Sequence, residues 1–92
     1  MTIYRAKYLA KPLHISANME HYKNLNRDSN ITQFEIQNDS IHVKFRDGKT
    51  YVYTYLSAGA ANIEKMKILA SNGKGLNTYI NDYVRKKYSN KY

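Results

Sequence analysis

The segment from Ile41 to Tyr55 constrains the fold of this chain more than any other. Apolar residues alternate with basic ones over 41–46, tyrosines alternate with threonine and valine over 50–55, and Asp47-Gly48 lies between the two runs. Alternation with a period of two is typical of strands, and an Asp-Gly pair between two such runs is a strong turn signal. The segment is therefore predicted to be a β-hairpin.

Two registers of this hairpin place its tyrosines on opposite faces. A two-residue loop at Asp47-Gly48 would pair Lys44 with Tyr51, so that the tyrosines share a face with the basic residues. A three-residue loop closed by a glycine bulge would pair Val43 with Tyr51 and place the tyrosines in the core. The second register separates apolar from polar side chains more cleanly and is favoured. The residues then expected on the outer face are His42, Lys44 and Arg46.

The segments around the hairpin complete an α+β pattern. Residues 31–37 are predicted to form a strand, which joins the hairpin in a three-stranded antiparallel β-meander. Apolar residues then recur at helical spacing over 60–71 and over 76–88, with Asn72-Gly73 ending the first run. The predicted fold is therefore α+β: a three-stranded antiparallel β-meander followed by two α-helices.

The N-terminal 28 residues are predicted to be an appended segment. Residues 1–11 alternate loosely and favour a strand, which Pro12 interrupts. A short helix over 17–25, capped by Ser16, competes with a continued period of two. The single domain is thus divided into an N-terminal extension (1–28, strand and/or short helix), a compact body (29–88) and a frayed C-terminus (89–92).

The charge of the chain suggests a class of partner. Fifteen Lys and Arg against seven Asp and Glu give a net charge of +8. Such a surplus suits a polyanion such as nucleic acid, although it is equally compatible with an inert basic surface. No segment has the length and hydrophobicity of a signal peptide or a membrane span, so no membrane association and a cytoplasmic location are expected.

Candidate nucleic-acid-binding residues come from three places. The hairpin offers cations for phosphate contacts, and its tyrosines would stack on bases if they are exposed. Lys74 lies in a glycine-containing loop beside the start of the second predicted helix, where free amides would favour an anion, unless the glycines serve the turn alone. The basic run 85–87 is also explained by a solvated last helical turn. The candidate residues are Lys44, Arg46, Tyr51, Tyr53, Lys74, Arg85, Lys86 and Lys87.

Catalytic and metal-binding patterns are not evident in the sequence. There is no cysteine, and His14, His21 and His42 lack the close spacing of common zinc motifs. The acidic residues are scattered, and no nucleophile is paired with a base. The chain is therefore predicted to be non-enzymatic and to need no cofactor.

Several short motifs run through 29–88 in a fixed order. They are Ser29-Asn30-Ile31, Ile41-x-Val43-x-Phe45-x-x-Gly48, Tyr51-x-Tyr53 and Ala70-Ser71-x-Gly73-x-x-x-Asn77-x-x-Ile80, followed by Tyr83. In order and spacing they resemble the KTSC domain, a module found at the C-terminus of some lysyl-tRNA synthetases and as a stand-alone bacterial protein. The resemblance implies a β-meander followed by helices and a suggested role in RNA binding, with no established activity. The chain departs from the family's pattern at Leu56-Ser57, where Val-Pro is frequent, and at Asn81, where a basic residue is common.

Charge and resemblance together favour a small basic module that binds RNA or single-stranded nucleic acid. The alternative is a protein-interaction or self-association module, for which the richness in tyrosine gives the motive. In that case the N-terminal strand would add to a sheet edge, either within the chain or across a homodimer.

Overall fold

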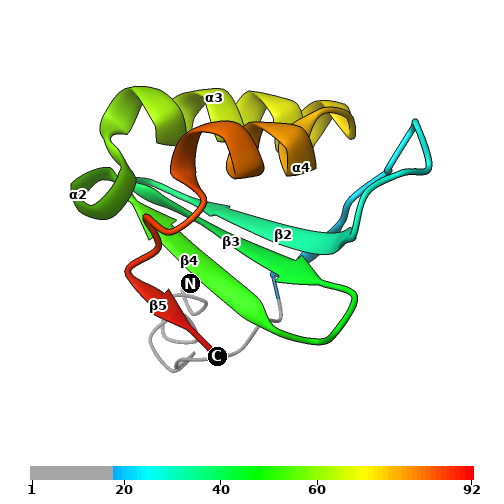
Figure 1. The fold of residues 1–92 in the computed structure, drawn as a ribbon, viewed down its shortest axis with the longest axis horizontal. Coiled ribbons are helices and arrows are strands. Elements are labelled where there is room, and N and C mark those ends of the chain that lie inside the picture. The colour runs from blue at the N-terminus through cyan, green and yellow to red at the C-terminus, as the bar shows by residue number, and fades with distance from the viewer. Residues whose placement is uncertain (1–17) are drawn as a thin grey trace, which may run out of the picture.

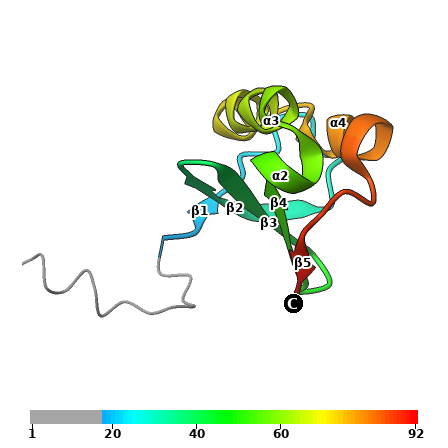
Figure 2. The same ribbon diagram turned by 90° about the vertical axis from the view of Figure 1, so that its left-hand side faces the viewer.

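A computed structural model describes residues 18–92, in which an antiparallel sheet carries helices on one face (Figures 1 and 2). The strands follow sequence order across the sheet: β1 (Glu20–His21), β2 (Ile31–Gln37), β3 (Ser40–Phe45), β4 (Thr50–Thr54) and β5 (Asn90–Lys91). The helices are α2 (Tyr55–Ala58), α3 (Ala60–Asn72), α4 (Leu76–Tyr79) and the π-helix η1 (Ile80–Val84). An α+β fold is thus confirmed, and the strand predicted over 1–11 lies outside the described residues.

The hairpin of β3 and β4 has the register that places its tyrosines toward the core. Val43 pairs with Tyr51 and Ile41 with Tyr53. The Phe45 amide donates to the Lys49 carbonyl over 2.9 Å, which leaves a three-residue loop between them. The favoured register is confirmed, and its cause is the burial of the apolar face, since a one-residue slip would expose every core side chain of the strand.

The core lies between the sheet and the helices. Ile41 and Val43 of β3 are fully buried, as are Ile63 and Met66 of α3. The second helical segment contributes residues at a spacing of four, namely Leu76, Ile80 and Val84. Tyr83, which falls within the helical run predicted over 76–88, is instead 58% exposed. The apolar stripes predicted for the two helices therefore do cover the sheet, except at this tyrosine.

The second helical segment ends earlier than its periodicity predicts. Helix α4 passes into η1, which stops at Val84, so the basic run 85–87 follows the helix and does not form its last turn. The reason lies in the sheet, because the chain must turn back to β4: the Ser89 amide donates to the Val52 carbonyl over 2.8 Å. Residues 89–92, predicted to be frayed, accordingly form β5 and its flanks, and Tyr92 and Thr50 exchange both backbone hydrogen bonds.

Residues 18–28, which the sequence places in the N-terminal extension, pair and pack with the body over 29–88. The short helix considered over 17–25 is wrong for residues 18–25, where β1 pairs with β2 instead. Tyr22 is 2% exposed and belongs to the same core as the meander. Hydrogen bonds of β1 and burial of this ring outweigh the weak local preference for a helix.

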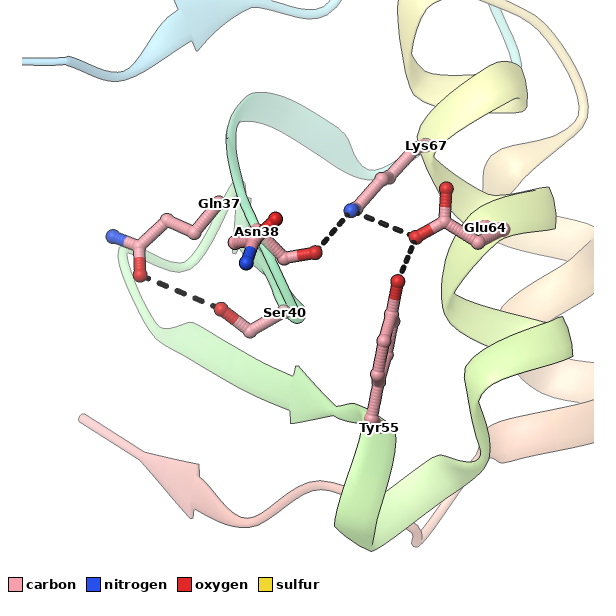
Figure 3. A network of polar contacts seen from close by, with 6 residues as sticks. All are labelled: Gln37, Asn38, Ser40, Tyr55, Glu64 and Lys67. Carbon is pink, nitrogen blue, oxygen red and sulfur yellow. Dashed lines mark hydrogen bonds and ion pairs between the residues drawn. The ribbon is translucent and has the colours of Figure 1, made fainter.

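A polar network ties α3 to the sheet (Figure 3). Lys67 Nζ lies 2.8 Å from the Asn38 carbonyl in the β2–β3 turn and 2.8 Å from Glu64 Oε2. Tyr55 at the start of α2 donates its hydroxyl to the same Glu64 oxygen over 2.5 Å. The network therefore joins the β2–β3 turn to α3 through Lys67, and α2 to α3 through the Glu64 carboxylate.

Candidate nucleic-acid interface

A cavity of about 520 Å³ lies between the β3–β4 turn and the end of η1. Its lining comes from residue 30, from the hairpin and from residues 80–88, so that distant parts of the sequence meet there. The volume is within the range of about 300–1,000 Å³ that small-molecule sites occupy. A π-helical turn borders it, and such turns are frequent at functional sites. We refer to this feature as the hairpin–η1 cavity.

Four aromatic side chains line the cavity together with Ile80: Phe45, Tyr51, Tyr53 and Tyr88. The Tyr51 ring packs edge-to-face with Phe45 at 5.3 Å between centroids, and with Tyr88 at 4.9 Å. Edge-to-face pairs stabilise one another beyond the area that they bury. The hairpin register brings in the first three rings, and the return of the chain toward β5 brings in Tyr88.

Three cations and one carboxylate line the same cavity, namely Arg46, Arg85, Lys86 and Asp47. Arg46 was expected beside His42 and Lys44 on the outer face of the sheet, and this prediction is wrong. Its amide donates to the Asn30 carbonyl over 2.8 Å, and β3 ends at Phe45. The regular strand ends at Phe45, and Arg46 after it is among the residues that line the cavity.

The structure gathers part of the candidate set and leaves the rest elsewhere. Arg46, Tyr51, Tyr53, Arg85 and Lys86 meet at the cavity. Lys44 follows Val43 in β3, and since successive strand residues point to opposite faces, it lies on the face away from the core. Lys87 is exposed next to the cavity but is not among its lining residues.

Lys74 lies in a different hollow, of about 80 Å³, in the loop before α4. The amide of Leu76, proposed to face an anion, donates to the Tyr22 hydroxyl over 3.3 Å. Asn77 accepts a hydrogen bond from the Asn30 amide over 3.3 Å. Because these bonds lie within the protein, the conformational role of this loop is the better supported of the two alternatives.

Tyr53 does not offer an open stacking face, because it is only 1% exposed. Its hydroxyl has no hydrogen-bond partner within residues 18–92, and burial raises its pKa, so the phenol stays protonated. Tyr51 is partly exposed, and Lys91 Nζ lies 5.4 Å from its ring centroid, a cation–π contact. Tyr51 and Tyr53 therefore line a cavity, and only Tyr51 meets the condition of exposure on which base stacking was expected.

Six lining residues were not identified as candidates from the sequence: Asn30, Phe45, Asp47, Ile80, Asn81 and Tyr88. Asn30 belongs to the first motif of the KTSC resemblance, which was a signal that could have been followed. Tyr88 was assigned to a helix stripe, and only the early end of η1 shows why it lies at the cavity. Asp47 had been noted as a turn residue only.

The opposite face of the sheet carries His42. Its Nδ1 lies 3.3 Å from the Tyr92 hydroxyl. Burial lowers the pKa of His42, although the nearby Glu35 carboxylate opposes this shift. Within residues 18–92, no three His, Asp or Glu side chains are grouped as metal ligands would be.

Comparisons with family models, with curated proteins and with solved structures find no match to this chain. The KTSC resemblance therefore stays a prediction. No helix between residues 18 and 92 is both long enough and apolar enough to cross a membrane.

Proposed function

We propose that this protein is a non-enzymatic module that binds RNA or other single-stranded nucleic acid at the hairpin–η1 cavity. One observation supports the proposal most: aromatic rings and cations from the hairpin and from the C-terminal segment line a single cavity. Proteins that bind single strands combine aromatic surfaces for bases with positive charge for phosphates. The net charge of +8 and the KTSC resemblance point to the same class of partner.

The charges around the cavity favour an anionic ligand. Arg46, Arg85 and Lys86 outnumber the one carboxylate, Asp47. Guanidinium groups bind phosphate in a bidentate manner, and each neutralised phosphate releases condensed counterions. Lys87 is exposed beside this group and extends the positive surface. Affinity is therefore expected to depend strongly on salt.

The proposal is one of binding without catalysis, as predicted from the sequence. Of the residues that the structure describes, those lining the cavity include one carboxylate and no histidine or serine. A lone exposed carboxylate next to arginine is poorly suited to act as a general base at neutral pH. The proposal requires no cofactor and retains the cytoplasmic location predicted from the sequence, a compartment that contains RNA.

The test is binding of mixed-sequence single-stranded RNA followed by fluorescence anisotropy at increasing salt. Three phosphate contacts predict a slope of about −2 for log K against log salt, hence about 20-fold weaker binding at about 200 mM than at about 50 mM. Replacing both Arg85 and Lys86 by alanine should reduce this slope by about 1 to 1.5.

Lys65→Ala is the matched control, because Lys65 is an exposed lysine of α3 that does not line the cavity. It should change the slope far less than the double variant. If single-stranded RNA does not bind at low salt, or if Lys65→Ala weakens binding as much as loss of Arg85 and Lys86, the proposal is wrong.

Self-association is the second candidate function, and Leu56 is the observation that favours it. This side chain of α2 is 97% exposed, an unusual position for a leucine. A homodimer that buries it should appear in light scattering as a doubled mass, and Leu56→Ser should return the monomer mass. A wild-type monomer at high concentration would exclude this alternative and leave the nucleic-acid proposal untouched.

A further inference from the structure

We infer that the hairpin–η1 cavity holds one unstacked nucleotide of a single strand, with its base among the aromatic rings and its phosphate on the Arg85 and Lys86 side. The inference rests on the proposed function and makes it more specific. Instead of a general basic surface, the ligand would occupy one defined binding site, and a single mononucleotide should be enough to fill it.

The shape and lining of the cavity suit a small ligand with a planar ring. At about 520 Å³ it is large enough for a small organic ligand, and rings of the hairpin and of Tyr88 line it. The Tyr51 and Tyr53 rings lie nearly parallel at 13°, whereas Tyr88 stands at 83° to Tyr51. Tyr53 is buried, so the rings open to a ligand are those of the partly exposed Phe45, Tyr51 and Tyr88. A planar base can contact such rings by stacking or edge-on.

Positive charge lies at the same cavity as the aromatic rings. Arg85 and Lys86 are adjacent in sequence directly after η1, and Arg46 reaches the cavity from the hairpin turn. The positive groups thus border the same space as the aromatic rings. A ligand that satisfies both must combine a planar ring with an anionic group, and a nucleoside monophosphate unit does so.

The buried hydroxyl of Tyr53 offers a hydrogen-bonding group to a ligand. A buried phenol normally has a hydrogen-bond partner, yet this one has none among residues 18–92. Tyr53 lines the cavity, so a polar atom of a bound ligand would supply the hydrogen-bond partner of its hydroxyl. The exposed amide side chains of Asn30 and Asn81 also line it, and each carries a donor and an acceptor for a base edge.

The occupant must be unstacked. In a duplex the faces of the bases are covered by their neighbours, and only groove edges are available to a protein. Rings that line a cavity can contact a base only after it leaves the stack, which costs least in single strands, loops and ends. Single-stranded RNA or DNA is therefore favoured over a duplex.

The experiment is an NMR titration of the full chain with each of the four ribonucleoside 5′-monophosphates. The corresponding nucleosides and inorganic phosphate serve as separate probes. We expect the monophosphates to shift the resonances of Tyr51, Tyr88 and Arg85, and to bind at least 10-fold more tightly than either the nucleoside or the phosphate. If phosphate alone binds as tightly as a monophosphate, the aromatic residues contribute nothing and the inference is overturned.

Two variants separate this inference from the proposed function. Tyr53→Phe retains the ring and removes the hydroxyl, so monophosphate affinity should fall about 3- to 10-fold while the melting temperature changes little. Tyr88→Leu removes one ring outside the regular strands and should weaken monophosphate binding by about 5-fold or more. Tyr83→Phe, at an exposed tyrosine outside the cavity lining, is the control and should leave the affinity unchanged.

Failure of this inference and failure of the proposed function give different results in these experiments. If single-stranded RNA binds with the predicted salt slope but no monophosphate shifts the cavity resonances, this inference fails and the proposed function stands. If monophosphates bind in the cavity and RNA does not, the site accepts a free nucleotide, and both the proposed function and the inference of a nucleotide within a single strand are overturned. Equal RNA binding by wild type, Tyr53→Phe and Tyr88→Leu would also overturn the inference.

Discussion

The hydroxyl of Tyr22 accepts a hydrogen bond from the backbone amide of Leu76, at 3.3 Å and across 54 residues of sequence. The bond is buried and lies at the first residue of α4, where a helix leaves its amides without intrahelical partners. Burial raises the pKa of Tyr22, and the bond from the Leu76 amide opposes this shift. A residue from the segment before the meander thus completes the start of a C-terminal helix.

Removal of this hydroxyl should destabilise the fold. Tyr22→Phe keeps the buried ring but leaves the Leu76 amide without its partner, which is expected to cost about 1–3 kcal/mol in the free energy of unfolding. Urea denaturation measures the cost. Tyr83→Phe is the matched control at a tyrosine that is 58% exposed, and it should change stability by less than about 0.5 kcal/mol. Equal stability of the two variants would show that the bond contributes nothing.

Gly73 tests how the segment that contains Tyr22 packs against the loop between α3 and α4, because Gly73 lies close to Lys23. A Cβ at this position would lie 2.5 Å from the Cβ of Lys23, and its φ of +77° is unfavourable for residues other than glycine. Gly73→Ala is therefore expected to destabilise by about 2–5 kcal/mol, from backbone strain and overpacking together.

Gly48→Ala separates the two causes. Gly48 has a φ of +89°, but no atom lies within 4 Å of the position that its Cβ would occupy. This substitution should therefore cost only the backbone term, about 1–2 kcal/mol. Thermal denaturation of both variants compares them. Equal losses would mean that the contact between Lys23 and Gly73 is not tight in solution.

The parts of the fold that the sequence predicted correctly depend on local patterns. Alternation and the Asp47-Gly48 turn were sufficient for the hairpin and its register, because only one register buries the apolar face. The helix ending at Gly73 was predicted in the same way, since a residue with positive φ at a helix end favours glycine.

The incorrect parts depend on contacts between distant residues. Nothing near Tyr22 in sequence indicates that its hydroxyl meets α4. The helical pattern over 76–88 continues past Val84, and only pairing with β4 explains why the helix stops there. The cavity shares this cause: Arg46 and Tyr88 reach it because a strand and a helix each end before their patterns do.

The hydrogen bonds around Glu64 predict a raised pKa for Tyr55. The hydrogen bond to Glu64 raises the pKa of Tyr55, and the bonds from Lys67 and Tyr55 lower the pKa of Glu64. Glu64→Gln removes the carboxylate, so the pKa of Tyr55 should fall toward its ordinary value. NMR of the tyrosine ζ-carbons follows this titration. Glu20→Gln, at an exposed carboxylate of β1, should leave the pKa of Tyr55 unchanged. An unshifted pKa in Glu64→Gln would contradict the 2.5 Å bond.

His42 predicts how stability depends on pH. Burial lowers its pKa in the folded state, so the unfolded chain takes up a proton first as the pH falls through the ordinary value of about 6.5. Proton uptake by the unfolded state lowers the free energy of unfolding, and the loss grows until the folded pKa is reached. Urea denaturation at about pH 8 and about pH 5.5 should therefore show lower stability at the acidic pH.

His42→Gln isolates this contribution, because glutamine does not titrate and retains hydrogen-bonding groups near the Tyr92 hydroxyl. The variant should lose less stability than the wild type between the two pH values. His21→Gln is the matched control, since His21 is an exposed histidine of β1, and it should lose as much as the wild type. If wild type and His42→Gln lose equal stability, partial burial does not lower the pKa of His42 as the structure indicates.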